Sequence, residues 1–386
     1  MDQAKPVPAV LVITWNFPPR HGGIENLVAG LSHNLKKSHP LFVVTSFASS
    51  AGRAEEGIFH SPWPGLLPFF LYAAWRGFIL MWRRPGIKVV LGGSALVTPL
   101  VVLLAAIFRR SAVVLVHGLD LLYPNFLYQS FCVRWIKHCD RIIANSRYTA
   151  SLARAKKGRA DRVYVIPPAV DPGAFQPPRS EEAKKAAGLE GRKVLLYVGR
   201  LARRKGVKEF LEGSLTALVA EIPEVCFLIV GGNPTGSLAH RDDVLGEIGV
   251  VVRERGLENH VRLLGWLSGT ELARTYQASD LLVLPALSVR DDVEGFGIVI
   301  LEAAAAGVPC VAMRVGGIPD AVANGKSGVL LEPDDYASMT ATLVNLLRDN
   351  EARQALGDYA RRRVAAEFAW PAVIQKYAEI LRTLES

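Results

Sequence analysis

The segment EGFGIVILE, from Glu294 to Glu302, places two carboxylates eight residues apart around a glycine-rich turn. We expect Glu294 to lie in a loop just after a strand, and Glu302 about one turn into a helix that begins near Gly297. A loop that opens a helix presents free N–H groups and the positive end of the helix dipole, which suits a diphosphate. Gly295 and Gly297 allow the backbone to approach such a ligand closely. From spacing alone, a helix N-cap followed by a first-turn acid explains the pattern equally well.

A basic loop follows the strand expected at Val194–Val198. Arg200 and Lys205 leave the carboxyl end of this strand, where cations can neutralise a diphosphate and the charge of a leaving group. Arg203 and Arg204 are expected to be solvated. The alternative is that the whole loop is solvated and binds no ligand.

Strand ends in the first half also carry residues that can contact a ligand. The run Arg20-His21-Gly22-Gly23 precedes a helix and can offer backbone N–H groups, although a plain strand–helix turn explains it equally well. His117 follows an expected strand and can hydrogen-bond a sugar hydroxyl or a developing charge, although a lone histidine is more often structural. Asn145-Ser146 is expected to be a helix N-cap pair. Similar glycine loops follow later strands: Gly231-Gly232-Asn233 and Gly316-Gly317-Ile318-Pro319.

Short β-branched runs alternate with helical stretches, and this rhythm positions all of these residues. In the first half the expected strands are Val10–Thr14, Leu41–Thr45, Val89–Leu91, Ala112–Val116, Arg141–Ala144 and Val163–Val165. In the second half they are Val194–Val198, Cys226–Val230, Val261–Leu264, Leu281–Leu284 and Val308–Met313. Intervening helices are expected at Gly22–Lys36, Leu96–Arg109 and Tyr148–Ala155, among others. This βαβ order predicts parallel sheets with helices on both faces.

Five prolines between Pro167 and Pro178 indicate a linker. The chain is therefore predicted to form two tandem, doubly wound α/β domains of the Rossmann-like kind, residues 1–172 and 173–370. Ligands of such sheets bind beyond the carboxyl ends of the strands, so the site is expected in a cleft between two facing domains. The amphipathic stretch Trp370–Leu384 predicts a last helix, and residues 371–386 are expected to pack back on the first domain.

Charge is distributed unevenly along the 386 residues. Residues 1–180 carry 21 Lys and Arg against 8 Asp and Glu, whereas the rest of the chain carries 24 against 28. A basic first half implies an acidic partner, such as a phosphorylated ligand or an anionic membrane surface. Nucleic acid is not expected, because the sequence lacks the signatures of RNP, zinc-finger and helix-turn-helix proteins.

Two apolar stretches bear on membrane contact. Ala95–Phe108 is uncharged but too short to span a bilayer, so a buried helix is expected. Leu66–Trp82 is apolar and aromatic and is followed by Arg83 and Arg84, so it is either an ordinary helix packed on a sheet or an in-plane membrane helix.

Compartment and cofactor follow from the remaining composition. The four cysteines are scattered without a C-x-x-C pair, which suits a reducing compartment. No run of His, Cys and carboxylates has the spacing of metal ligands, so neither a metal nor another cofactor is expected. We therefore expect a cytoplasmic protein, and docking on the inner face of the cell membrane is a further hypothesis from the basic first half.

In their order along the chain, these motifs resemble those of the retaining glycosyltransferases of glycosyltransferase family 4, which have the two-domain GT-B fold. The resemblance covers nearly the whole chain and rests on these segments: Gly22-Gly23, His117-Gly118, Asn145-Ser146, Pro167–Asp171, Gly199-Arg200, Lys205-Gly206 and Glu294–Glu302. It implies a metal-independent enzyme that moves a hexose from a nucleotide-sugar donor.

The resemblance implies a role for each matching residue. Arg200 and Lys205 would bind the donor diphosphate, and Glu302 would bind the ribose hydroxyls. His117 would contact the sugar from the first domain, and Gly23 would lie near the reaction centre.

Other implied contacts come from two loops of the second domain. Glu294 and the backbone after it would hold the transferred sugar and the diphosphate, and these backbone residues are Gly295, Phe296, Gly297 and Ile298. Gly265 and Trp266 would lie at the edge of the nucleobase. The residues implied to act in catalysis are His117, Arg200, Lys205 and Glu294.

The substrates implied by the resemblance are less specific. Two segments are most similar to those of mannosyltransferases that act on phosphatidylinositol mannosides: Phe17–Arg20 with Gly22-Gly23, and Asp292–Gly295. Mannose from GDP-mannose is therefore the favoured donor, UDP-sugars are the alternative, and the acceptor would be lipid-linked or a polysaccharide precursor. The acceptor hydroxyl would attack from the face that the diphosphate leaves, without a protein nucleophile. Two functions of another class stay open, a nucleotide-sugar epimerase and a non-catalytic membrane-bound scaffold.

Overall fold

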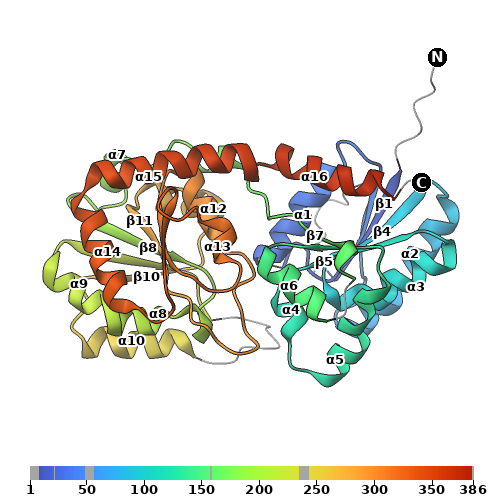
Figure 1. Ribbon diagram of the computed structural model, residues 1–386, viewed down its shortest axis with the longest axis horizontal. Coiled ribbons are helices and arrows are strands. Elements are labelled where there is room, and N and C mark those ends of the chain that lie inside the picture. Colours follow the sequence, from blue (N-terminus) through green and yellow to red (C-terminus); the bar gives the residue numbers. More distant parts are fainter. Residues whose placement is uncertain (1–7, 21, 48–55, 157–158, 234–242, 385–386) are drawn as a thin grey trace, which may run out of the picture. The chain divides into compact units, whose positions relative to one another are not determined.

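The computed structural model describes residues 8–20, 22–47, 56–156, 159–233 and 243–384. The chain forms two compact units, residues 1–168 with 370–386 and residues 169–369 (Figure 1). Each unit holds one parallel β-sheet with helices packed against it, as the alternating pattern predicts. The chain passes from the first unit to the second between Pro168 and Ala169, inside the proline-rich segment, and returns between Ala369 and Trp370.

The first unit is built on a seven-stranded sheet with the order β3-β2-β1-β4-β5-β6-β7. Its strands are β1 (Ala9–Thr14), β2 (Leu41–Thr45), β3 (Ile58–His60), β4 (Ile87–Gly92), β5 (Ser111–Val116), β6 (Arg141–Ala144) and β7 (Val163–Val165). The three-residue strand β3 is too short to stand out in the sequence. The central strand β1 is buried along its whole length, as expected for a parallel strand covered on both faces.

The helices of the first unit are α1 (Gly23–Leu35), α2 (Leu66–Arg83), α3 (Thr98–Phe108), α4 (Leu119–Leu122), α5 (Phe126–Phe131), α6 (Arg147–Ala155) and α16 (Trp370–Arg382), with 3-10 turns η1 (Ala95–Val97), η2 (Val133–His138) and η3 (Ala160–Arg162). Helices α2 and α3 lie side by side, and α16 packs on α1 (Figure 1). The helix expected at Ala95–Phe108 is present as η1 and α3, but only one of its faces is buried. Leu103 and Ile107, one turn apart on α3, are each 53% exposed, because only the opposite face of α3 packs in the core.

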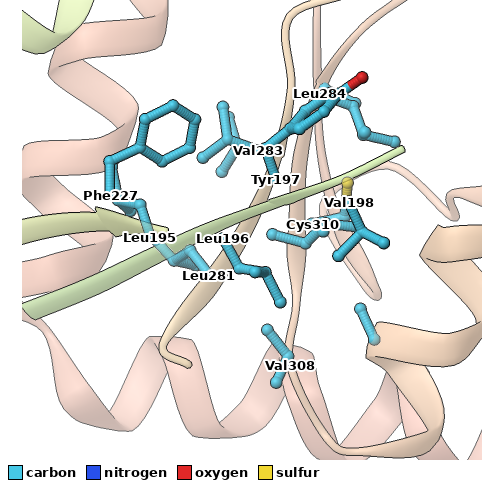
Figure 2. Packing of buried hydrophobic residues seen from close by; sticks show 14 of the residues in the cluster. Leu195, Leu196, Tyr197, Val198, Phe227, Leu281, Val283, Leu284, Val308 and Cys310 are labelled. Atoms are coloured by element: carbon cyan, nitrogen blue, oxygen red, sulfur yellow. The ribbon is translucent and has the colours of Figure 1, made fainter. Parts of the chain in front are cut away.

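The second unit is built on a six-stranded sheet with the order β10-β9-β8-β11-β12-β13. Its strands are β8 (Lys193–Val198), β9 (Val225–Val230), β10 (Val261–Gly265), β11 (Leu281–Leu284), β12 (Cys310–Met313) and β13 (Gly328–Leu331). Side chains of β8 and β11 fill the core together with Phe227, Val308 and Cys310 (Figure 2). The sequence pattern predicts all of these strands except β13.

The helices of the second unit are α7 (Glu181–Ala186), α8 (Val207–Phe210), α9 (Thr216–Glu221), α10 (Val244–Glu254), α11 (Gly269–Gln277), α12 (Ile298–Ala305), α13 (Ile318–Ala321), α14 (Tyr336–Arg348) and α15 (Asn350–Arg363). Short turns complete the unit: the 3-10 turns η4 (Pro172–Phe175) and η5 (Arg203–Lys205), and the π-helical turns η6 (Leu211–Leu215) and η7 (Val364–Phe368). Within the described residues, no helix is both long enough and apolar enough to cross a bilayer.

Candidate functional site

The predicted binding loops of the second unit meet where its strand order reverses. Strand β9 lies on one side of β8 and β11 on the other, so the loops after β8 and β11 begin at neighbouring strand ends. Crevices at such switch points are the usual ligand sites of doubly wound sheets. The loop after β8 carries Arg200 and Lys205, and the loop after β11 carries Glu294.

Lys205 and Glu294 form the centre of a buried ion-pair cluster. The Nζ of Lys205 lies 2.7 Å from Oε2 of Glu294, and the same oxygen lies 2.5 Å from a guanidinium nitrogen of Arg204. Burial would raise the pKa of Glu294, but the two cations outweigh it and hold the pKa at about 2. Burial lowers the pKa of Lys205, and Glu294 opposes that shift. Glu294 is therefore an ionised, fixed carboxylate at neutral pH.

The three basic residues of the η5 turn differ sharply in environment. The expectation that Arg204 is solvated is wrong, because its side chain is 7% exposed and also pairs with Asp292 at 2.8 Å. Arg203 is exposed as expected and pairs with Glu247. Arg200 is exposed and has no ion pair among the described residues, so its charge is available to a ligand.

Glycines hold these loops in close contact. Gly206 has a φ of 65°, and any Cβ there would collide with the carbonyl of Pro285, so the η5 turn lies tightly against the end of β11. A Cβ at Gly316 would likewise collide with the carbonyl oxygen of Glu294. That carbonyl accepts a 2.8 Å hydrogen bond from the backbone N–H of Gly317. The glycine loop after β12 thus supports the backbone of Glu294.

Helix α12 begins directly after the glycine-rich loop, as predicted. Gly297 is its N-cap, with a left-handed φ of 86° that favours glycine. Phe296 is 2% exposed and packs beside Phe368, so its side chain belongs to the core and only its backbone can contact a donor. Gly295 and Ile298 are half-buried and flank these two residues.

Glu302 lies on α12 and is held by a residue that sequence reasoning missed. Its Oε2 accepts a 2.8 Å hydrogen bond from the hydroxyl of Tyr276, which is fully buried on α11. Burial raises the pKa of Glu302, and the bond from Tyr276 opposes that shift. Glu302 lies on α12 and Glu294 lies in the loop that precedes this helix, so one continuous segment carries both carboxylates.

Gly265 and Trp266 lie at the end of β10, beside the switch-point loops. The carbonyl of Gly265 accepts a 2.8 Å hydrogen bond from the N–H of Gly231. A Cβ at Gly231 would collide with the carbonyl of Gly199, so these strand-end loops are closely packed. The indole of Trp266 lies against Gly232 and is 59% exposed. An exposed indole at this edge can stack on a planar base.

The glycine turn of the first unit begins helix α1 at Gly23, which is exposed. Glu25, in the first turn, folds back toward Gly22 and accepts a 2.8 Å hydrogen bond from Asn16. A carboxylate therefore already occupies part of the positive end of α1. His21 lies outside the described residues.

His117 is buried after β5 and uses one ring nitrogen within the fold. Its Nε2 lies 2.8 Å from the carbonyl oxygen of Gly93, and its Nδ1 has no partner within the described part of the chain. A small cavity of about 10 Å³ is lined by His117 and Asn145, among others. Ser146 is the N-cap of α6, as predicted, because its hydroxyl accepts from the N–H of Thr149.

Within the described residues, no three His, Cys, Asp or Glu side chains are grouped so that they could hold a metal ion. The switch-point loops instead gather cations, an ionised carboxylate and a helix N-terminus. Such an arrangement can bind a diphosphate through Arg200 and Lys205 and a hydroxylated group through Glu294.

Two family sequence profiles match the chain, one on each unit. Residues 21–174 match the profile described as Glycosyltransferase Family 4, and residues 179–363 match the profile described as Glycosyl transferases group 1.

Two characterised relatives differ in how much of their length is matched. A D-inositol 3-phosphate glycosyltransferase of Corynebacterium urealyticum is 34% identical over 64% of this chain and 58% of its own length. The chain therefore spans little more than half of that relative. A GDP-mannose-dependent alpha-(1-6)-phosphatidylinositol monomannoside mannosyltransferase of Mycolicibacterium smegmatis is 28% identical over 96% of this chain and 98% of its own length.

Solved structures show the same fold. The Anabaena protein HepE, crystallised with UDP and glucose, superposes with a TM-score of 0.79 over 98% of this chain and 100% of its own, at 20% identity. At this identity the comparison concerns the fold alone, and that fold is a pair of Rossmann-like domains of the GT-B kind.

Proposed function

Because the chain belongs to glycosyltransferase family 4, we propose that it is a retaining glycosyltransferase that moves mannose from GDP-mannose to a lipid-linked or polysaccharide-precursor acceptor. The observation that carries the proposal is the ion-pair cluster of Lys205 and Glu294 beside exposed Arg200, at the switch point of the second sheet. Similarity along nearly its full length to a GDP-mannose-dependent mannosyltransferase supports mannose as the sugar.

In the proposed reaction, the acceptor hydroxyl attacks the anomeric carbon from the face that the diphosphate leaves. The new C–O bond forms as the bond to the diphosphate oxygen breaks, and that oxygen takes the hydroxyl proton. Arg200, Lys205 and the N-terminus of α12 stabilise the charge that develops on the leaving diphosphate. Glu294 accepts hydrogen bonds from the sugar. These cations supply the charge that a divalent metal supplies elsewhere, so we propose that the reaction is metal-independent.

A thermal-shift screen of the protein with GDP, GDP-mannose, UDP and UDP-glucose tests the donor. A ligand at about 100 times its Kd stabilises the native state by about 2.7 kcal/mol, which is readily measured. Stabilisation by the guanine pair supports GDP-mannose, and stabilisation by the uracil pair alone identifies a UDP-sugar enzyme. No response to any nucleotide would support a non-catalytic scaffold. Isomerised donor in the absence of an acceptor would support an epimerase.

For the acceptor side, we propose that the first unit docks peripherally on an anionic membrane from the cytoplasm. Helix α2 packs on the sheet with one face and leaves an apolar stripe on the other, formed by Leu67, Leu71, Trp75 and Trp82, which are 58–70% exposed. Arg83 and Arg84 follow at its end. An in-plane helix buries such a stripe in the headgroup region, and nearby cations attract anionic lipid.

The apolar surface continues beyond α2. Helix α3 contacts α2 and η2, and η2 contacts α5, so these elements adjoin one another. Their outward side chains include Leu103 and Ile107 of α3 and Phe126, Leu127 and Phe131 of α5, all more than half exposed. Exposed apolar side chains on these adjoining elements support docking in the interfacial layer of a bilayer.

Co-sedimentation with vesicles tests the docking proposal. The protein should pellet with phosphatidylglycerol vesicles, pellet less at high salt, and largely stay in solution with phosphatidylcholine vesicles. Trp75→Ser and Trp82→Ser should weaken pelleting, whereas Val250→Ser, which removes an exposed apolar side chain from α10 of the second unit, should not. A protein that stays in the supernatant with anionic vesicles at low salt refutes the docking proposal.

A further inference from the structure

Arg204 is the most buried of the three consecutive basic residues in the η5 turn, and it contacts two carboxylates of one loop. Its Nε lies 2.8 Å from Asp292 and its NH1 lies 2.5 Å from Glu294. Asp292 and Glu294 are two residues apart in the loop after β11, and Val293 between them is buried. The planar guanidinium can hold both carboxylates at once, which a lysine ammonium cannot do in the same geometry.

The turn that presents Arg204 is itself fixed to the loop after β11. The carbonyl of Arg204 accepts a 2.8 Å hydrogen bond from the N–H of Leu287, and Gly206 lies against Pro285. Backbone and side chain of Arg204 therefore join the loop after β8 to the loop after β11. Any shift of Arg204 would move Glu294 relative to Lys205.

The contacts of Glu294 are divided between its two oxygens. Oε2 forms ion pairs with both Arg204 and Lys205, whereas Oε1 has no hydrogen-bond partner among the described residues. With Oε2 held by two cations, the carboxylate cannot rotate without breaking an ion pair. Oε1 is thereby kept as an acceptor for hydroxyl groups.

The charges of the cluster balance only when Arg204 is present. Arg204 and Lys205 carry two positive charges, and Asp292 and Glu294 carry two negative charges. Without Arg204 the three remaining side chains carry a net negative charge, and Asp292 loses its ion pair with the guanidinium. A negative cluster would repel a diphosphate placed beside Lys205.

We propose that Arg204 is a positioning residue that orients Glu294 toward the transferred sugar and, by neutralising Asp292 and Glu294, leaves the charge of Lys205 for the donor diphosphate. This inference rests on the proposed function of the same site. Arg204 itself contacts neither the sugar nor the phosphates.

Binding of GDP and GDP-mannose to the full-length protein tests the two effects separately, because GDP carries the diphosphate without the sugar. Arg204→Gln should weaken GDP binding about tenfold through the lost charge. Arg204→Lys keeps the charge and should bind GDP nearly as wild type does. It cannot hold both carboxylates, so the ratio of GDP-mannose to GDP affinity should fall about tenfold.

Two further variants separate positioning from structural damage. Arg204→Gln combined with Asp292→Asn restores the charge balance, so GDP affinity should return to within about threefold of wild type. Arg203→Gln is the matched control, because Arg203 is the exposed neighbour and pairs outside the cluster. Both affinities should be unchanged in that control.

The pH dependence gives an independent readout. The charged and titratable groups that face Glu294 come from the end of β8, the η5 turn and its own loop: Tyr197, Arg200, Arg204, Lys205 and Asp292. With Arg204 removed, the effect of burial on Glu294 is less fully offset, so its pKa rises. GDP-mannose binding by Arg204→Gln should then weaken as the pH falls toward that pKa, while the wild-type protein and Arg203→Gln keep an ionised Glu294 over the same range.

The outcomes distinguish this inference from the proposed function. If the wild-type protein binds no nucleotide, the proposed function fails. If the wild-type protein binds both ligands and Arg204→Gln binds them equally well, the positioning role is overturned while the proposed function stands. A double variant that stays as weak as Arg204→Gln overturns the charge-balance argument in particular.

Discussion

The depressed pKa of Glu294 makes a quantitative prediction about stability. The folded-state pKa is about 2, against an ordinary value of 4.5 in the unfolded chain, so folding stabilises the ionised form of Glu294 relative to the protonated form. At about 1.4 kcal/mol per unit, this difference contributes about 3 kcal/mol to the free energy of unfolding at neutral pH. The contribution comes from Lys205 and Arg204, after subtraction of the cost of burial.

The sign of the pH dependence follows from the depressed value. The stabilisation is present above pH 4.5, is lost as the pH falls through the unfolded-state value toward 2, and is about 2 kcal/mol smaller at pH 3 than at pH 7. Glu294→Gln cannot titrate, so the difference in unfolding free energy between wild type and this variant should shrink by that amount. Titrating groups outside this ion-pair cluster cancel in the difference.

Urea-induced unfolding followed by circular dichroism at pH 7, 5 and 3 measures this difference. Glu258→Gln, which removes an exposed carboxylate of the same unit, is the control and should show no such trend. A wild-type minus Glu294→Gln difference that stays constant between pH 7 and pH 3 would refute the ion-pair account of Glu294.

Three further predictions follow from the site and the first unit. Lys205→Ala and Glu302→Ala should each lose most transfer activity, which corresponds to a loss of roughly 2–4 kcal/mol in transition-state stabilisation. Circular dichroism should show that both variants are folded. Near-wild-type turnover in both would refute the site assignment. Transfer should survive excess EDTA, and a loss that Mg²⁺ or Mn²⁺ restores would mean that a metal takes part. Gly30→Ala should lower the unfolding midpoint, because a Cβ at Gly30 would overlap the ring of Trp370 and overpacking costs about 1–3 kcal/mol, whereas Gly249→Ala meets little and should not.

The sequence was sufficient to predict most strands because parallel strands buried on both faces are continuous apolar runs. It was also sufficient to locate the glycine loops at the strand ends, since Gly199 follows a strand, Gly265 ends one and Gly297 precedes a helix. In these cases the signal is local. A glycine with positive φ or an apolar run is determined by its own neighbours in the chain.

Contacts that depend on distant segments could not be predicted in the same way. Arg203, Arg204 and Lys205 are consecutive and chemically alike, and only the position of the loop after β11 decides which of them is buried. Tyr276 resembles any core tyrosine of an amphipathic helix until α12 places Glu302 beside its hydroxyl. The apolar stripe of α2 was ambiguous for a related reason. A helix that is apolar on several sides does not reveal which side packs on the sheet.

The hydrogen bonding of His117 limits the chemistry that the first unit can contribute. The carbonyl oxygen of Gly93 can only accept, so the Nε2 of His117 carries a proton, and in the neutral ring Nδ1 has a lone pair. Nδ1 has no partner within the described residues, and a buried acceptor without a donor is costly. A sugar hydroxyl or a water molecule can supply that donor. In its neutral form His117 is therefore suited to accept a hydrogen bond from a hydroxyl group.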